Sequence, residues 1–95
     1  MMQDDLLLVM LKQDLEILHT VKDDYLKNLI RTAQRMIARE GITLGDDFED
    51  NGIVVMYAAW MYRKRAAPDS AMPRMIRAAM NNKLFAQKAT VITDV

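Results

Sequence analysis

The chain has 95 residues and no cysteine, and its 13 cations balance its 13 acids, so the formal net charge is zero. This length predicts a single domain, residues 1–95, with one modest core, and the lack of cysteine excludes disulfides and thiolate metal sites. The longest apolar run, residues 6–11, is too short for a membrane span and follows acids where a secretion signal would carry cations. We therefore expect a protein that stays in the cytoplasm where it is made and has no membrane partner.

The charges are divided unevenly along the chain. Residues 1–50 carry six cations against eleven acids, and residues 51–95 carry seven cations against two acids. Opposite charges on two surfaces suit head-to-tail packing of identical chains. Ion pairing within one chain is the alternative explanation.

Residues 4–18 are predicted to form the first helix. Asp4 and Asp5 open it, where negative charge is favourable, and leucines follow at spacings of three and four residues. The apolar density of residues 6–11 leaves a strand open as an alternative.

The second helix is predicted to begin with Thr20 and Asp23 as a capping box and to end at Gly41. One face is a stripe of leucine, isoleucine and alanine, and the opposite face carries a cation at every turn. Like charges one turn apart disfavour a helix by roughly 0.2–0.5 kcal/mol per pair. This basic face is therefore either a solvated surface or a surface for an acidic partner or nucleic acid; it consists of Lys27, Arg31, Arg35 and Arg39.

An acidic loop, residues 41–52, precedes the third helix. It resembles a calcium loop only superficially, because the third position is Glu49 and the twelfth, where calcium needs a bidentate glutamate, is Ala58. The acids are better explained as residues that start a helix, since negative charge and an aspartate cap favour a helix N-terminus.

The third helix, predicted for residues 49–66, is apolar on every side from residue 53 to residue 62. Such a helix must be buried all round, either at the centre of its own domain or between its domain and a neighbouring subunit. Its tyrosines and tryptophan are typical of protein interfaces. Three cations close the helix, which is more than its terminal carbonyls require.

The fourth helix is predicted to start at Pro73, and its apolar stripe is expected to face the core. A second face carries cations beside Phe85. The β-branched residues 90–93 are predicted to be an extended tail, either disordered or an arm that pairs with another chain. The stripe consists of Met75, Ile76, Ala79, Met80 and Ala86. These elements predict an all-α fold, a small bundle of about four helices with a short extended C-terminal tail.

The chain offers no set of side chains suited to catalysis. His19 is the only imidazole and Ser70 the only serine, and the paired carboxylates lie where helices are expected to begin. We expect no enzyme activity, no catalytic residue, no cofactor and no bound metal.

Two segments carry a resemblance: residues 55–65, VMYAAWMYRKR, and residues 72–88, MPRMIRAAMNNKLFAQK. They resemble the C-terminal half of the phage head–tail connector proteins, the head-completion adaptors. The resemblance implies a structural virion protein that forms a homo-oligomeric ring, dodecameric in the particle, and extends the DNA channel. Its implied partners are the portal protein, a tail or later head-completion protein, and the packaged DNA through non-specific contact. The implied location is the head–tail junction of the virion, and the host cytoplasm during assembly.

The surface patterns and the resemblance together assign three groups of residues. Subunit contacts are expected at Arg31, Arg35, Arg39, Asp46, Asp47, Glu49, Tyr57, Trp60 and Met61. The C-terminal helix and tail, residues 73–95, are expected to dock on the portal through Arg74, Arg77, Asn81, Asn82, Phe85, Lys88, Val91 and Ile92. The DNA channel is expected near Arg63, Lys64 and Arg65. The alternative function is a small helical nucleic-acid-binding regulator, which the zero net charge disfavours.

Overall fold

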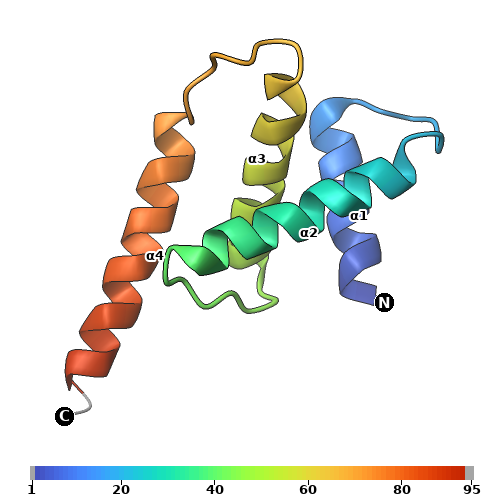
Figure 1. Cartoon of the computed structure of the whole chain (residues 1–95). Helices are drawn as coiled ribbons and strands as arrows, with labels where there is room; N and C mark the ends of the chain where they lie inside the picture. The colour runs from blue at the N-terminus through green and yellow to red at the C-terminus, as the bar shows by residue number, and fades with distance from the viewer. Residues whose placement is uncertain (1, 94–95) are drawn as a thin grey trace.

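The computed structural model describes residues 2–93, with side chains for residues 4–89. In that range it contains four helices and no strand: α1 (Met2–Leu15), α2 (Asp23–Arg39), α3 (Phe48–Lys64) and α4 (Arg74–Thr93). α3 packs against the other three helices, and α1 and α2 also pack against each other (Figure 1). The predicted all-α bundle of about four helices is confirmed.

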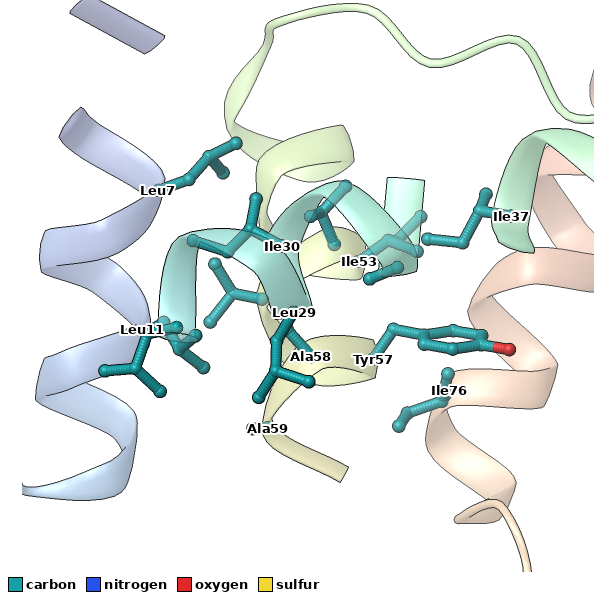
Figure 2. Close-up of a cluster of buried hydrophobic side chains, with 14 of the residues drawn as sticks. Leu7, Leu11, Leu29, Ile30, Ile37, Ile53, Tyr57, Ala58, Ala59 and Ile76 are labelled. Carbon is teal, nitrogen blue, oxygen red and sulfur yellow. The ribbon is translucent and has the colours of Figure 1, made fainter. Parts of the chain in front are cut away.

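The core is built around α3. Its side chains Ile53, Tyr57 and Ala58 lie in one buried cluster with leucines and isoleucines of the other helices (Figure 2). Ala58 is fully buried and Ala59 nearly so, and such small residues let neighbouring backbones approach closely. The apolar character of α3 on every side therefore follows first from its central position. Its C-terminal half nevertheless keeps partly exposed apolar residues: Met56, Trp60, Met61 and Tyr62.

α1 ends three residues earlier than predicted, at Leu15. Glu16 adopts a left-handed conformation with φ 59°, which an L-residue with a side chain rarely does. The Ile17 N–H then donates to the Lys12 carbonyl at 2.9 Å, and the Glu16 N–H to the Gln13 carbonyl at 3.3 Å. This pattern closes a helix C-terminus even without glycine.

The predicted start of α2 was wrong and its predicted end is confirmed. Thr20 forms no capping box: its carbonyl accepts from the Asp23 N–H, and Lys22 occupies the cap position without a side-chain cap. The Lys22 side chain donates to the Tyr62 hydroxyl at 2.7 Å instead, so a tertiary contact holds this turn. At the other end Gly41 follows the helix with φ 92°.

Asp47 caps α3, as expected for one of the acids in the loop before it. Its Oδ1 accepts from the Asp50 N–H at 2.8 Å. Asp50 is buried. Its carboxylate accepts a hydrogen bond from the Gly45 N–H at 2.6 Å and forms an ion pair with Lys83 of α4 at 2.7 Å. The acidic loop is thus held by local hydrogen bonds and by a tertiary ion pair.

α4 corrects the prediction of an extended tail, because the backbone of residues 90–93 continues the helix. β-Branched residues lower helix propensity only slightly, and extending an existing helix needs no new nucleation. Within α4, Ile76 and Met80 are buried as predicted, whereas Met75 is exposed. Gln87 joins the helix to the α2–α3 loop by exchanging two hydrogen bonds with the Thr43 backbone.

Two glycines test the role of Gly41 at the end of α2: Gly41 itself, and Gly52 inside α3 as its control. Gly41→Ala is expected to lower the free energy of unfolding by about 1 kcal/mol, because alanine disfavours a positive φ. Gly52→Ala is expected to raise it by up to about 1 kcal/mol, since Gly52 lies inside α3 with open space where a Cβ would be. Urea unfolding of both variants measures the difference. Equal effects would contradict the role assigned to Gly41.

Candidate functional site

An open groove of about 540 Å³ lies between α2 and the C-terminal half of α3. We call it the Trp60 groove. It is mostly apolar and aromatic, which is the usual character of a binding surface. Its lining residues are Thr32, Met36, Tyr57, Trp60, Met61, Lys64, Arg65 and Pro68. The structure therefore brings the three predicted interface residues of α3 together at one surface.

The aromatic residues of the groove differ in their exposure. Tyr57 is only 4% exposed, and burial raises the pKa of its hydroxyl, to which the nearby Glu40 carboxylate adds. The Trp60 ring stands edge-on to Tyr57, with ring centres 5.5 Å apart, and the Lys64 ammonium lies 5.0 Å over it. The Trp60 indole N–H is shielded from solvent and has no acceptor in the described part of the chain. Tyr57 thus supports the groove from below, while Trp60 is the partly exposed residue of the pair.

A second cluster of aromatic rings and cations lies at the end of α3. The Arg65 guanidinium stands 5.0 Å from the ring centres of both Tyr25 and Tyr62, which suits cation–π attraction. The hydrogen bond from Lys22 lowers the pKa of the Tyr62 hydroxyl, and the charges of Lys22 and Arg65 act in the same direction. This cluster joins α2 to the end of α3.

The three cations expected near a DNA channel all have partners within the chain. Arg63 donates to a carboxylate oxygen of Asp14 at 3.1 Å and to the Asp14 carbonyl at 3.2 Å. Lys64 lies over Trp60, and Arg65 lies over the two tyrosines. The contacts with Asp14 and with the aromatic rings therefore account for all three. Their placement at a DNA channel stays a prediction.

The basic face of α2 points outward. Arg31, Arg35 and Arg39 are exposed, and no acid lies within ion-pair distance of them among the residues whose side chains are described. Arg35 follows the lining residue Thr32 by three positions, and Arg39 follows the lining residue Met36 by three, so each lies one helical turn from the groove. The Trp60 groove is thus flanked by cations from α2 and from the end of α3.

The acids predicted at a subunit contact flank an exposed aromatic residue in the sequence. Asp46, Asp47 and Glu49 are all exposed, and Phe48 between them is 84% exposed. Phe48 was not among the predicted contact residues, because it lies outside the apolar run of the third helix, which begins at residue 53. Met36 was missed for a related reason: it lies beside the apolar stripe of α2 and not on it.

Much of the uneven charge along the chain is neutralised by pairing within the molecule. Three ion pairs join an acid of residues 1–50 to a cation of residues 51–95: Asp14–Arg63, Glu40–Arg77 and Asp50–Lys83. When the residues of these three pairs are left out of the count, the net charge of each half of the sequence falls from five to two in magnitude. The alternative of intramolecular pairing thus explains more than half of the pattern.

The residues predicted to dock on a portal share the outer side of α4 only in part. Arg74, Asn82, Phe85 and Lys88 are exposed, and Asn81 is half-buried. Arg77 is held by Glu40 at 2.6 Å, which ties the start of α4 to the end of α2 and raises the pKa of the guanidinium. The side chains of Val91 and Ile92 lie outside the described residues.

Two further features are absent from the part of the chain that the structure describes. No three histidine or acidic side chains there are grouped to hold a metal ion. Over the same residues, none of the helices combines the length and hydrophobicity that crossing a membrane requires.

Comparisons with protein-family models, with curated proteins and with solved structures find no match for this chain. Its function has to be inferred from its own surfaces.

Proposed function

We propose that this chain is a structural adaptor subunit of a tailed phage. In this proposal it assembles as a homo-oligomeric ring between the portal and the tail or later head-completion proteins, and extends the DNA channel. The observation that carries the proposal is that residues 55–65, which resemble the connector family, form one wall of the Trp60 groove. An apolar groove at the surface of so small a domain is a natural place for another protein chain.

The other surfaces support the same proposal. Exposed cations on α2 and exposed acids in the α2–α3 loop give one molecule two surfaces of opposite sign, which suits repeated contacts between copies. α4 carries exposed Phe85 and Lys88 and projects beyond the other helices (Figure 1), as a docking arm would. The protein would then reside at the head–tail junction of the virion.

The proposal is tested by mixing the purified chain with portal rings of the phage that encodes it. Native mass spectrometry and electron microscopy are expected to show several copies of the chain bound as a ring. Monomers only, both alone and with portal rings, would overturn the proposal. The double variant Arg31→Glu/Arg35→Glu is expected to assemble less while its melting temperature stays within a few degrees of the wild-type value, because both side chains are exposed and without an acidic partner in the described residues.

The second candidate is a small helical nucleic-acid-binding regulator, favoured by the exposed Arg31, Arg35 and Arg39. Three phosphate contacts would make the logarithm of the binding constant fall with the logarithm of salt concentration, with a slope of about −2.7. Tight, sequence-dependent gel shifts by the monomer, with a slope at least this steep, would favour this candidate. Binding to portal rings but not to duplex DNA would favour the adaptor.

A further inference from the structure

Phe48 stands out among the exposed apolar residues because of the charges beside it. It is 84% exposed at the start of α3, and three exposed acids surround it in sequence: Asp46, Asp47 and Glu49. We call residues 46–49 the acidic knob. A large ring held in water has no stabilising role within the monomer, since its apolar surface gains nothing there.

The Trp60 groove has the complementary chemistry. Its apolar lining includes Met36, Trp60 and Met61, and methionine side chains adapt readily to an incoming aromatic ring. Its edges carry cations, because Lys64 and Arg65 belong to its lining. On α2, Arg35 and Arg39 each lie one helical turn from a lining residue. An aromatic residue flanked by acids fits both the shape and the charge of this surface.

We propose that the acidic knob of one copy inserts Phe48 into the Trp60 groove of the next copy. This inference rests on the proposed function in that it names the surfaces through which copies of the ring meet. The acids beside Phe48 then face the cations at the edges of the groove.

The two surfaces lie at opposite ends of one helix. Phe48 begins α3 and Trp60 lies twelve residues further on, which places them roughly 18 Å apart along the helix axis. In Figure 1 the loop that precedes α3 and the end of α3 lie at opposite sides of the molecule. A knob therefore cannot fill the groove of its own chain, and each copy offers a free knob and a free groove. Such a head-to-tail contact generates a ring or an open filament instead of a closed dimer.

Three other exposed apolar residues, Phe85, Met75 and Leu18, fit the groove less well. Phe85 and Met75 of α4 lie beside Lys88 and Arg74, so their surroundings have the same sign as the edges of the groove. Leu18 is exposed in the α1–α2 loop. The α1–α2 loop lies near the C-terminal end of α3, where the groove is, because Lys22 at the end of the loop contacts Tyr62. Leu18 is therefore not remote from the groove. It is Phe48 that combines an exposed ring, negative surroundings and a position remote from the groove.

The test uses two variants that damage one surface each. Phe48→Ala removes the ring and leaves the charges of the knob, and Met36→Glu places an acid in the groove without touching the knob. Both positions are on the surface, and alanine and glutamate suit helices, so both variants should fold. Sedimentation velocity is expected to show self-association of the wild type and an at least roughly 100-fold weaker association of each variant alone. Raising the salt concentration should weaken the wild-type association as well.

Mixing the two variants gives the decisive result. The intact knob of Met36→Glu can enter the intact groove of Phe48→Ala, but the dimer so formed has only a damaged knob and a damaged groove left. We therefore expect a 1:1 heterodimer and no larger species. Trp60, the only tryptophan, reports the contact directly, because its fluorescence should shift to shorter wavelength when Phe48 covers it. Met75→Ala, at another exposed apolar residue, is the matched control and should associate as the wild type does.

The same measurements are repeated on portal rings, with the number of bound copies counted by native mass spectrometry. Wild-type association, free or on the ring, that Phe48→Ala leaves unchanged would overturn the inference and leave the proposed function standing. A mixture of the variants that stays monomeric while the wild type associates would also overturn it, as would a wild type that associates neither free nor on the ring. Knob-dependent association of the free chain without any binding to portal rings would support the inference and refute the proposed function.

Discussion

Ile30→Ala is expected to lower the free energy of unfolding by about 3 kcal/mol, one of the largest effects of a single substitution in this chain. Ile30 is 2% exposed and belongs to the cluster in which leucines of α1, the apolar stripe of α2 and the central helix α3 meet (Figure 2). Alanine leaves a cavity there in addition to the lost hydrophobic burial. Because a domain of this size has only about 5–10 kcal/mol of stability, the melting temperature should fall by roughly 12–24 °C.

Leu18→Ala is the control for this prediction. Leu18 is 96% exposed, so the same kind of truncation should change the free energy of unfolding by less than about 0.5 kcal/mol. Differential scanning calorimetry or urea unfolding compares the two variants. A similar loss in both would mean that Ile30 does not lie in a packed core.

Asp50→Ala is expected to lower the free energy of unfolding by about 2–4 kcal/mol. Asp50 is 2% exposed and joins three elements: it accepts the Gly45 N–H, forms an ion pair with Lys83 of α4 at 2.7 Å, and its own N–H is capped by Asp47. Alanine would leave the Lys83 ammonium largely desolvated without its partner and the Gly45 N–H without an acceptor. Asp50→Asn keeps an acceptor for the Gly45 N–H and should lower the free energy of unfolding by less.

The ion pair also gives this prediction a pH dependence. The hydrogen bond to Asp50 raises the pKa of Lys83 above its ordinary value of 10.5. Because the pKa is raised in the folded state, the ion pair stabilises that state fully at pH values below 10.5. Its contribution is lost as the pH rises through the raised pKa. The difference in unfolding free energy between wild type and Lys83→Met should therefore narrow at strongly alkaline pH. A difference that stays constant up to that pH would contradict a charged pair.

The positions of the four helices could be predicted because their patterns are local. The spacing of leucines, the Gly41 stop and the aspartate cap each act within a few residues, and all three are found in the structure. The errors occur where distant residues intervene. Thr20 does not cap α2: Lys22 occupies the cap position, and its side chain contacts Tyr62 of α3. α1 stops early through a left-handed Glu16 that no composition rule predicts.

The candidate site shows the same division. The unbroken apolar run of α3 was sufficient to single out Tyr57, Trp60 and Met61, which the structure places in the lining of one groove. That they contact another subunit stays a prediction. That Met36 forms the opposite wall depends on how α2 crosses α3, and no local pattern contains that crossing.

The amino-acid sequence was enough to predict an all-α bundle, since helix propensity and hydrophobic periodicity act over a few turns. It left open whether the third helix lies at the centre of its own domain or between two subunits. The packing of the helices determined the rest. It pairs three acids of the first half with three cations of the second, directs Phe48 into solvent and opens the Trp60 groove at the other end of α3. These features depend on which residues meet across the bundle, and such distances are set by the whole core and not by any one segment.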